Sequence, residues 1–142
     1  MPKMIFENLP VADLARSTAF YESIGAVKNE KFSDATASAM VLSETIHVML
    51  LTHDKFRQFT PKAIADARTT SEVLICISAD SRDDVDSMVE KAGTGGKVDP
   101  GPKQDYGFMY GRSFEDPDGH IWEVMWMDVA AAFAAGNEQA AA

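Results

Sequence analysis

The stretch FEDPDGHIWEVMWM, residues 114–127, decides the fold of this chain. Its Asp-Pro-Asp-Gly segment has the chemistry of a tight turn, because Pro117 presets φ, the aspartates bond nearby backbone groups and Gly119 accepts a positive φ. The residues that follow, from Ile121 to Met127, are apolar on both faces with one exception. This pattern predicts a strand that is buried on both sides.

Glu123 is the exception. It lies in the middle of the apolar run, with Ile121 and Met125 on its own face of the strand. Burying an ionised carboxylate costs several kcal/mol unless a cation or hydrogen bonds compensate it. The sequence therefore predicts a partner for Glu123: a metal, an arginine, a bound ligand or a proton.

The composition is that of one globular domain. The chain has 142 residues, of which 46% are hydrophobic and 25% charged. A net charge of −9 argues against a nucleic-acid surface. There is no apolar run long enough to span a membrane and no signal-peptide pattern, so we expect a cytoplasmic protein with no membrane partner. The single Cys76 excludes an internal disulfide and is expected to be a small core residue.

The first half of the chain predicts a strand, a helix and three further strands. The strand runs from Met4 to Leu9, and Asp13 is the expected N-cap of a helix that ends at Gly25. The core face of this helix is formed by Leu14, Ser17, Phe20, Tyr21 and Ile24. Three short strands follow at about 26–32, 37–43 and 45–52. Residues 53–70 form a connector and a candidate lid.

The second half repeats this order. A strand is expected from Glu72 to Ser78, and then a helix that is capped by Asp80 or Ser81 and ends at Gly93. Residues 95–103 are a loop with room for one edge strand, and 108–114 pairs with 121–127 as a hairpin. The fold class is α+β, with two βαβββ modules (about 1–52 and 71–128) in one domain, 1–128, and an alanine-rich tail, 129–142.

The Asp116 to His120 turn followed by Trp122-Glu123, together with the segment from Asn8 to Tyr21, resembles the vicinal oxygen chelate superfamily. This superfamily contains glyoxalases, bleomycin resistance proteins and extradiol dioxygenases. The resemblance implies a curved, barrel-like mixed sheet with helices outside, a small-molecule site in the cleft between modules, and a homodimer. The implied chemistry is that of a metal-dependent lyase, isomerase or dioxygenase; the alternative is a metal-free binding protein of the bleomycin-resistance type.

The resemblance also implies a divalent metal (Fe, Mn, Ni or Zn) held by residues of four strands. Glu123 matches the last ligand. The other three positions fall at Phe6, Met49 and Leu74, which are not metal ligands. The neighbouring polar residues are Asn8, His47 and Glu72, so a site made of His47, Glu72 and Glu123 requires each strand to shift by two residues.

A cross-strand ion pair is the other explanation for Glu123. If Glu115 lies opposite His120, Arg112 lies directly across from Glu123 and compensates its charge. A register that differs by one residue places Ser113 there instead. We favour Arg112, because it is itself a charge within a strand and needs a partner. A fixed arginine in a cavity can also bind a carboxylate or phenolate substrate.

Histidines and aromatic residues complete the candidate site. His47 is the expected general base beside Glu123, whereas His120 is expected to make a structural hydrogen bond and His53 to be exposed. The expected substrate-contacting residues are Arg112, Tyr110, Tyr106, Phe6, Asn8 and Met49. Three hypotheses follow: a metal-dependent enzyme, a metal-free binding protein, and a metal-free enzyme with His47 or Glu123 as base.

Overall fold

The first module is a four-stranded sheet with one helix on it. The computed structural model describes residues 2–134. The elements of this module are β1 (Ile5–Val11), α1 (Leu14–Ser23), β2 (Val27–Asn29), a 3-10 turn η1 (Glu30–Phe32), β3 (Ala37–Val41) and β4 (Ile46–Thr52). The strand order is β1-β4-β3-β2, and β1 runs parallel to β4.

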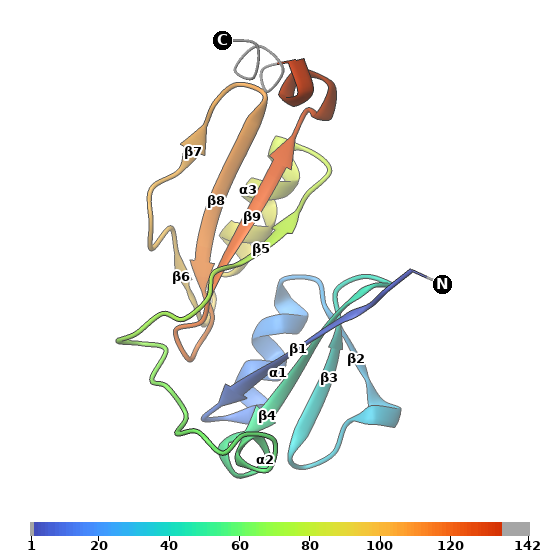
Figure 1. Cartoon of the computed structure of the whole chain (residues 1–142), viewed down its shortest axis with the longest axis vertical. Helices are drawn as coiled ribbons and strands as arrows, with labels where there is room; N and C mark the ends of the chain where they lie inside the picture. Colours follow the sequence, from blue (N-terminus) through green and yellow to red (C-terminus); the bar gives the residue numbers. More distant parts are fainter. Residues whose placement is uncertain (1, 135–142) are drawn as a thin grey trace.

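The second module has a separate five-stranded sheet and repeats this arrangement (Figure 1). Its elements are β5 (Ile75–Ser78), α3 (Arg82–Lys91), β6 (Lys97–Val98), β7 (Gln104–Asp105), β8 (Met109–Glu115) and β9 (Ile121–Met127). The strand order is β5-β9-β8-β6, with β7 also on β8, and β5 runs parallel to β9. A short helix, α2 (His53–Arg57), and irregular chain connect the modules.

The predicted α+β class is confirmed, and the first module has the predicted βαβββ order; the second module has one additional short strand, because both β6 and β7 precede β8. The two sheets are curved but do not close into a barrel. The strand expected from Glu72 begins only at Ile75, and Val73 and Leu74 before it are exposed. In the alanine-rich tail, residues 129–134 are helical; the rest of the tail lies outside the described residues.

Both helices begin at the predicted caps. The Asp13 carboxylate accepts a hydrogen bond from the Arg16 N–H at 3.0 Å, and the Ser81 hydroxyl accepts one from the Asp84 N–H at 3.0 Å. Ser81 is thus the cap of α3, rather than Asp80. Gly25 follows α1 with φ 110°, a conformation that favours glycine. Within residues 2–134, no helix is long and apolar enough to cross a membrane.

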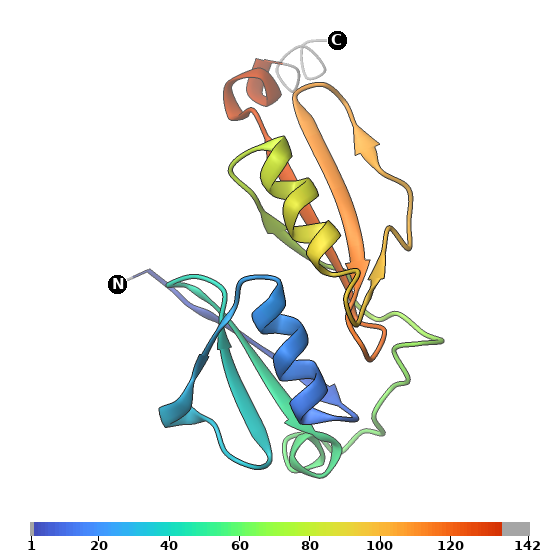
Figure 2. The ribbon, with the colours of Figure 1, turned by 180° about the vertical axis from the view of Figure 1, so that it is seen from behind.

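Each sheet has one face covered by a helix and one open face. Both helices lie behind their sheets in Figure 1 and in front of them in Figure 2, so the open faces point to the same side. Along β9, Trp122 and Val124 are buried under α3, whereas Glu123 on the open face is only half-buried. The expectation that this strand is buried on both sides is wrong, because no second layer covers the open face within the described chain.

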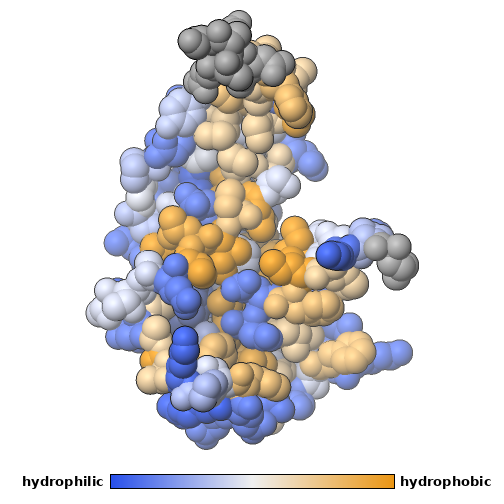
Figure 3. Space-filling view, in the orientation of Figure 1, coloured by the Kyte–Doolittle hydropathy of each residue, from blue (hydrophilic) through white to orange (hydrophobic). Residues whose placement is uncertain are grey.

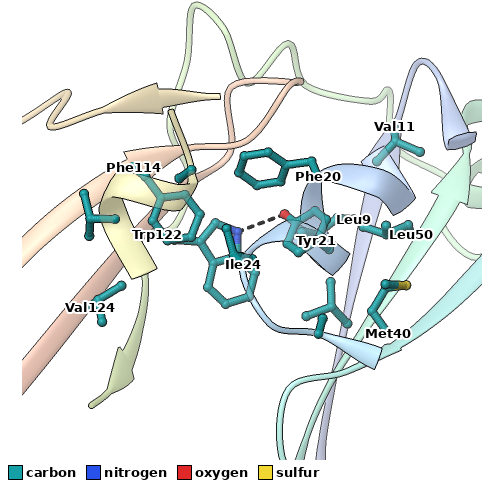
Figure 4. Close-up of a cluster of buried hydrophobic side chains, with 14 of the residues drawn as sticks. Leu9, Val11, Phe20, Tyr21, Ile24, Met40, Leu50, Phe114, Trp122 and Val124 are labelled. Atoms are coloured by element: carbon teal, nitrogen blue, oxygen red, sulfur yellow. Dashed lines mark hydrogen bonds between the residues drawn. The ribbon is translucent and has the colours of Figure 1, made fainter. Parts of the chain in front are cut away.

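One hydrophobic core joins the two modules on their helix side. Phe20 and Tyr21 of α1 meet Phe114 of β8 and Trp122 of β9 (Figure 4). The rings of Tyr21 and Trp122 pack edge to face at 6.0 Å, and those of Phe20 and Phe114 lie 5.9 Å apart. Such aromatic contacts stabilise beyond their buried area. The modules therefore share one interior.

The turn between β8 and β9 is docked on the first module. The Asp118 carboxylate accepts hydrogen bonds from the Ala12 N–H (2.8 Å) and the Ser17 hydroxyl (3.1 Å) at the start of α1. His120 Nε2 lies 2.9 Å from the carbonyl oxygen of Pro10, which gives His120 the predicted structural hydrogen bond. The turn that identifies the fold in the sequence thus also fixes one module against the other.

Candidate functional site

Glu123 lies on the open face of the second sheet. Its neighbours across the strands are Cys76 of β5 and Ser113 of β8. Within the part of the chain that the structure describes, no hydrogen bond or ion pair holds its carboxylate. The side chain is half-buried, so water reaches it and the carboxylate is free to meet a ligand.

A cavity of about 350 Å³ opens over Glu123. Most of its wall is apolar, from Leu74, Pro100, Pro102, Met109, Ile121 and Met125. The polar groups are few and include Glu123, Cys76, Ser113 and Gln104. Apolar walls with a few placed polar groups are typical of small-molecule sites. This one presents a single negative charge in an apolar hollow.

The predicted pair of Arg112 and Glu123 is wrong. Arg112 lies opposite Val124, and Ser113 lies opposite Glu123, which is the alternative register. The hairpin closes one residue later than expected, because the Asp116 N–H donates to the His120 carbonyl oxygen at 3.0 Å. Neighbouring residues of a strand point to opposite faces, so this one-residue difference moves Arg112 to the helix side.

On the helix side, the guanidinium of Arg112 forms ion pairs with carboxylates. Its guanidinium pairs with Asp86 at 2.9 Å, Glu90 at 2.7 Å and Asp99 at 2.7 Å, and its side chain is 3% exposed. Hydrogen bonding to Asp99, then to Asp86 and Glu90, raises the pKa of Arg112 well above its ordinary value. The Tyr110 hydroxyl also donates to Asp86, at 2.6 Å. Arg112 is one of the residues that line the Glu123 cavity, but its guanidinium is held by these carboxylates on the helix side, and Tyr110 is not part of the cavity wall.

Four other predicted residues are brought together on the open face of the first sheet. Phe6 lies opposite His47, and Asn8 lies opposite Met49. The Phe6 and His47 rings stack at 4.8 Å, and His47 Nε2 lies 3.2 Å from the Glu44 carbonyl oxygen. His47 and Glu123, the two expected catalytic residues, are thus on different sheets. Tyr106 is exposed beside β7, and its hydroxyl donates to Gln104 at the cavity wall.

The donor set does not fit the metal site that the resemblance implies. Within residues 2–134, no three His, Cys, Asp or Glu side chains are grouped so that they can hold an ion. His47 belongs to the first sheet, Glu72 lines a different cavity beside the connector, and Glu123 belongs to the second sheet. Phe6, Met49 and Leu74 stand at the three remaining ligand positions and offer no oxygen or nitrogen side-chain donor.

Cys76 is the site residue that the sequence did not indicate. It is exposed on the open face beside Glu123 rather than buried in the core. Partial desolvation, and then the negative charge of Glu123, raise the pKa of its thiol. The residues around Cys76 are apolar on both faces of the strand, so the sequence pattern does not show which face is covered.

Comparisons with known proteins agree with this architecture. The family model described as the Glyoxalase/Bleomycin resistance protein/Dioxygenase superfamily matches residues 5–124. A search of curated proteins found no match.

Solved structures show the same fold. A hypothetical protein from S. aureus is 25% identical, with 89% of this chain and 95% of that chain covered and a TM-score of 0.73. A glyoxalase-related enzyme from Fulvimarina pelagi is 19% identical, with coverage of 89% and 88% and a TM-score of 0.72. The fosfomycin resistance protein FosX from Listeria monocytogenes is 18% identical, with coverage of 89% and 93% and a TM-score of 0.63.

Proposed function

Because this chain belongs to the glyoxalase/bleomycin resistance protein/dioxygenase superfamily, we propose that it binds a small organic molecule, without a metal, in the cavity over Glu123. One observation carries the proposal: a carboxylate with no partner in the described chain faces an otherwise apolar hollow. A ligand that brings a positive charge or hydrogen-bond donor supplies what Glu123 lacks.

The cavity defines the class of ligand. Its volume of about 350 Å³ falls within the range of roughly 300–1,000 Å³ that is usual for small-molecule pockets. Apolar walls favour a hydrophobic body, and Glu123 favours a protonated amine or another strong donor at one end. Arg112, which points to the other face, does not neutralise Glu123 by direct contact. The ligand is therefore a hydrophobic organic cation.

A homodimer completes this site in the proposal. β1 pairs only with β4, and β5 only with β9, so each sheet has a free edge in the described chain. Phe6 is 55% exposed and Leu74 is 56% exposed beside these edges, and Figure 3 shows apolar surface gathered on this side of the molecule. Pairing of two copies covers this surface and sets the open face of one first module over the Glu123 face of the other copy.

Metal-dependent lyase, isomerase or dioxygenase chemistry is the second candidate. The position of Glu123, separated from the Asp-Pro-Asp-Gly-His turn by Ile121 and Trp122, favours it, because this is the place of the last metal ligand in the resemblance. A metal-free enzyme with His47 or Glu123 as general base is the third. Elemental analysis and turnover separate these two candidates from simple binding.

The test compares wild type with Glu123→Gln, using Glu22→Gln as a control for loss of one exposed carboxylate on α1. Benzylamine is titrated by calorimetry, and metal per chain is measured on protein purified without chelator or histidine tag. We expect no stoichiometric metal and about tenfold weaker benzylamine binding in Glu123→Gln alone, since a hydrogen bond to a charged group contributes about 1.5–3 kcal/mol.

Two outcomes contradict the proposal. Near-stoichiometric metal that disappears in Glu123→Gln establishes the metalloenzyme instead. Equal affinity for benzylamine in wild type and Glu123→Gln shows that the carboxylate does not recognise the ligand.

A further inference from the structure

A second cavity, of about 490 Å³, lies beside the connector and away from the Glu123 cavity. Basic and imidazole side chains from three segments line it: His53 and Arg57 of α2, Arg68 of the connector, and His120 of the turn. The chain as a whole carries a net charge of −9, with 13 Lys and Arg against 22 Asp and Glu. The two arginines and two histidines share the cavity wall with two carboxylates, Asp66 and Asp118.

The connector is held firmly where it supplies Arg68. Gly119 has φ +94°, and a Cβ at this position would lie 2.8 Å from the Ala67 oxygen and 2.9 Å from the Arg68 Cα. The backbones approach so closely because Gly119 has no side chain. Arg68 Nη2 also donates to the Pro117 carbonyl oxygen at 3.2 Å. Arg68 is thereby anchored at the cavity wall.

The acidic groups nearby are already engaged. Asp118 accepts from Ala12 and Ser17 with its two oxygens, and Asp66 accepts from the Arg68 N–H at 3.0 Å. Asp54 pairs with Arg57 at 2.8 Å, but their side chains are 94% and 58% exposed. Such exposed pairs contribute little and are readily exchanged for another anion. Arg57 and Arg68 thus remain able to bind a ligand.

A hollow of about 260 Å³, the one that Glu72 lines, adjoins this cavity; its other charged lining residues are Glu7 and Lys62. The two share a wall that includes Pro10, Ala63, Ile64, Ala65, Ala67 and His120. The hollow extends between the free edge of β1 and the start of β5, and its lining includes Leu9, Phe56, Val73, Ile75 and Ile121. Charged groups at one end and apolar side chains at the other suit an amphipathic molecule.

We propose that the two hollows form a binding site for a small carboxylate with an apolar body. The carboxylate lies between Arg57 and Arg68, which offer the planar donor pairs that match its geometry. The apolar body lies along Phe56, Ile64 and Ile121. This site shares Ile121 with the wall of the Glu123 cavity, but its arginines lie outside that cavity and select a ligand of the opposite charge.

Titration of the full chain with benzoate tests the site, with the amide chemical shifts of residues 53–75 and 117–121 as readout. Benzamide is the neutral control of the same shape. Arg57→Gln and Arg68→Gln each remove one donor pair, and Lys91→Gln, at the exposed end of α3, is the matched control for loss of one positive charge. We expect benzoate to bind at least about tenfold tighter than benzamide, and each arginine variant, but not Lys91→Gln, to weaken benzoate about tenfold.

Other outcomes overturn the proposal. If benzoate and benzamide bind equally well, or if both arginine variants keep the benzoate affinity of wild type, the arginines do not recognise the carboxylate. Acetate binding as tightly as benzoate removes the role of the apolar hollow. Glu123→Gln is expected to leave benzoate binding unchanged, so a failure here is distinguishable from a failure at Glu123.

Discussion

The Tyr21 hydroxyl links three elements of the molecule. It donates to Asp116 Oδ2 at 2.6 Å and accepts from Trp122 Nε1 at 3.0 Å. Burial, and then the charge of Asp116, raise the pKa of Tyr21 well above its ordinary value, so the phenol stays protonated and remains a donor. Asp116 in turn accepts from the backbone N–H groups of Asp118 and His120. One oxygen atom thus connects α1 of the first module to the turn of the second.

Replacing this hydroxyl leaves two buried polar groups unpaired. We expect Tyr21→Phe to lower the free energy of unfolding by about 1–3 kcal/mol, the usual cost of an unsatisfied buried group. Urea denaturation measures the change, with Tyr106→Phe, whose ring is exposed beside β7, as the control. A Tyr21→Phe protein as stable as the control would show that the network contributes nothing.

At the scale of the elements, local signals in the sequence are reliable and the register of the hairpin is not. Asp13 and Ser81 predict where the two helices begin, because capping depends on residues close in sequence. The pairing of β8 with β9 depends on where the turn closes, and one residue decides which face Arg112 occupies. Turn chemistry alone did not distinguish closure at Glu115 from closure at Asp116.

The sequence is a still poorer guide to which face of each strand is covered. An apolar run shows that a strand can be buried, but a sequence does not show which layer covers it. The sequence therefore predicts a buried environment for Cys76 and Glu123, although both lie on an open face. The sequence predicts that Tyr110 and Arg112 contact a ligand, but in the structure both side chains donate hydrogen bonds to Asp86 of α3.

The contact between α3 and β8 depends on Arg112. Hydrogen bonds from Tyr110 and then Arg112 lower the pKa of Asp86, and hydrogen bonding to Arg112 lowers the pKa of Asp99. A carboxyl whose pKa is lower in the folded state stabilises the fold above its unfolded pKa of about 3.9, and this stability is lost as the pH falls through the folded pKa. The ion cluster therefore makes the fold sensitive to acid below about pH 4.

Arg112→Met should remove this sensitivity. We expect a loss of about 1–3 kcal/mol at pH 7, because Arg112 is buried while its acidic partners keep contact with water. The difference from wild type should shrink toward pH 3, where the carboxyls take up protons. Urea denaturation at both pH values, with Lys91→Met as control, measures it. Parallel curves for wild type and Arg112→Met between pH 7 and pH 3 would contradict this account.

On the scale of the whole molecule, the two open faces lie on one side and leave apolar side chains in water. We expect Leu74→Arg to weaken the proposed homodimer, because it places a charge beside the free edge of β5. Size-exclusion chromatography with light scattering measures the mass. Ala19→Arg, exposed on the helix side, is the control and should leave the dimer intact. A monomeric wild type at the same concentration would refute the dimer.

The core that Phe20, Tyr21, Phe114 and Trp122 build between the modules has a consequence for cooperativity. Small single domains usually unfold in one cooperative transition, and two structural repeats that share one interior meet this condition. The two modules repeat each other in topology, yet we expect them to unfold as a single unit. We therefore expect a destabilising substitution in the first module to lower the free energy of unfolding of the second module as well, including the strand that carries Glu123.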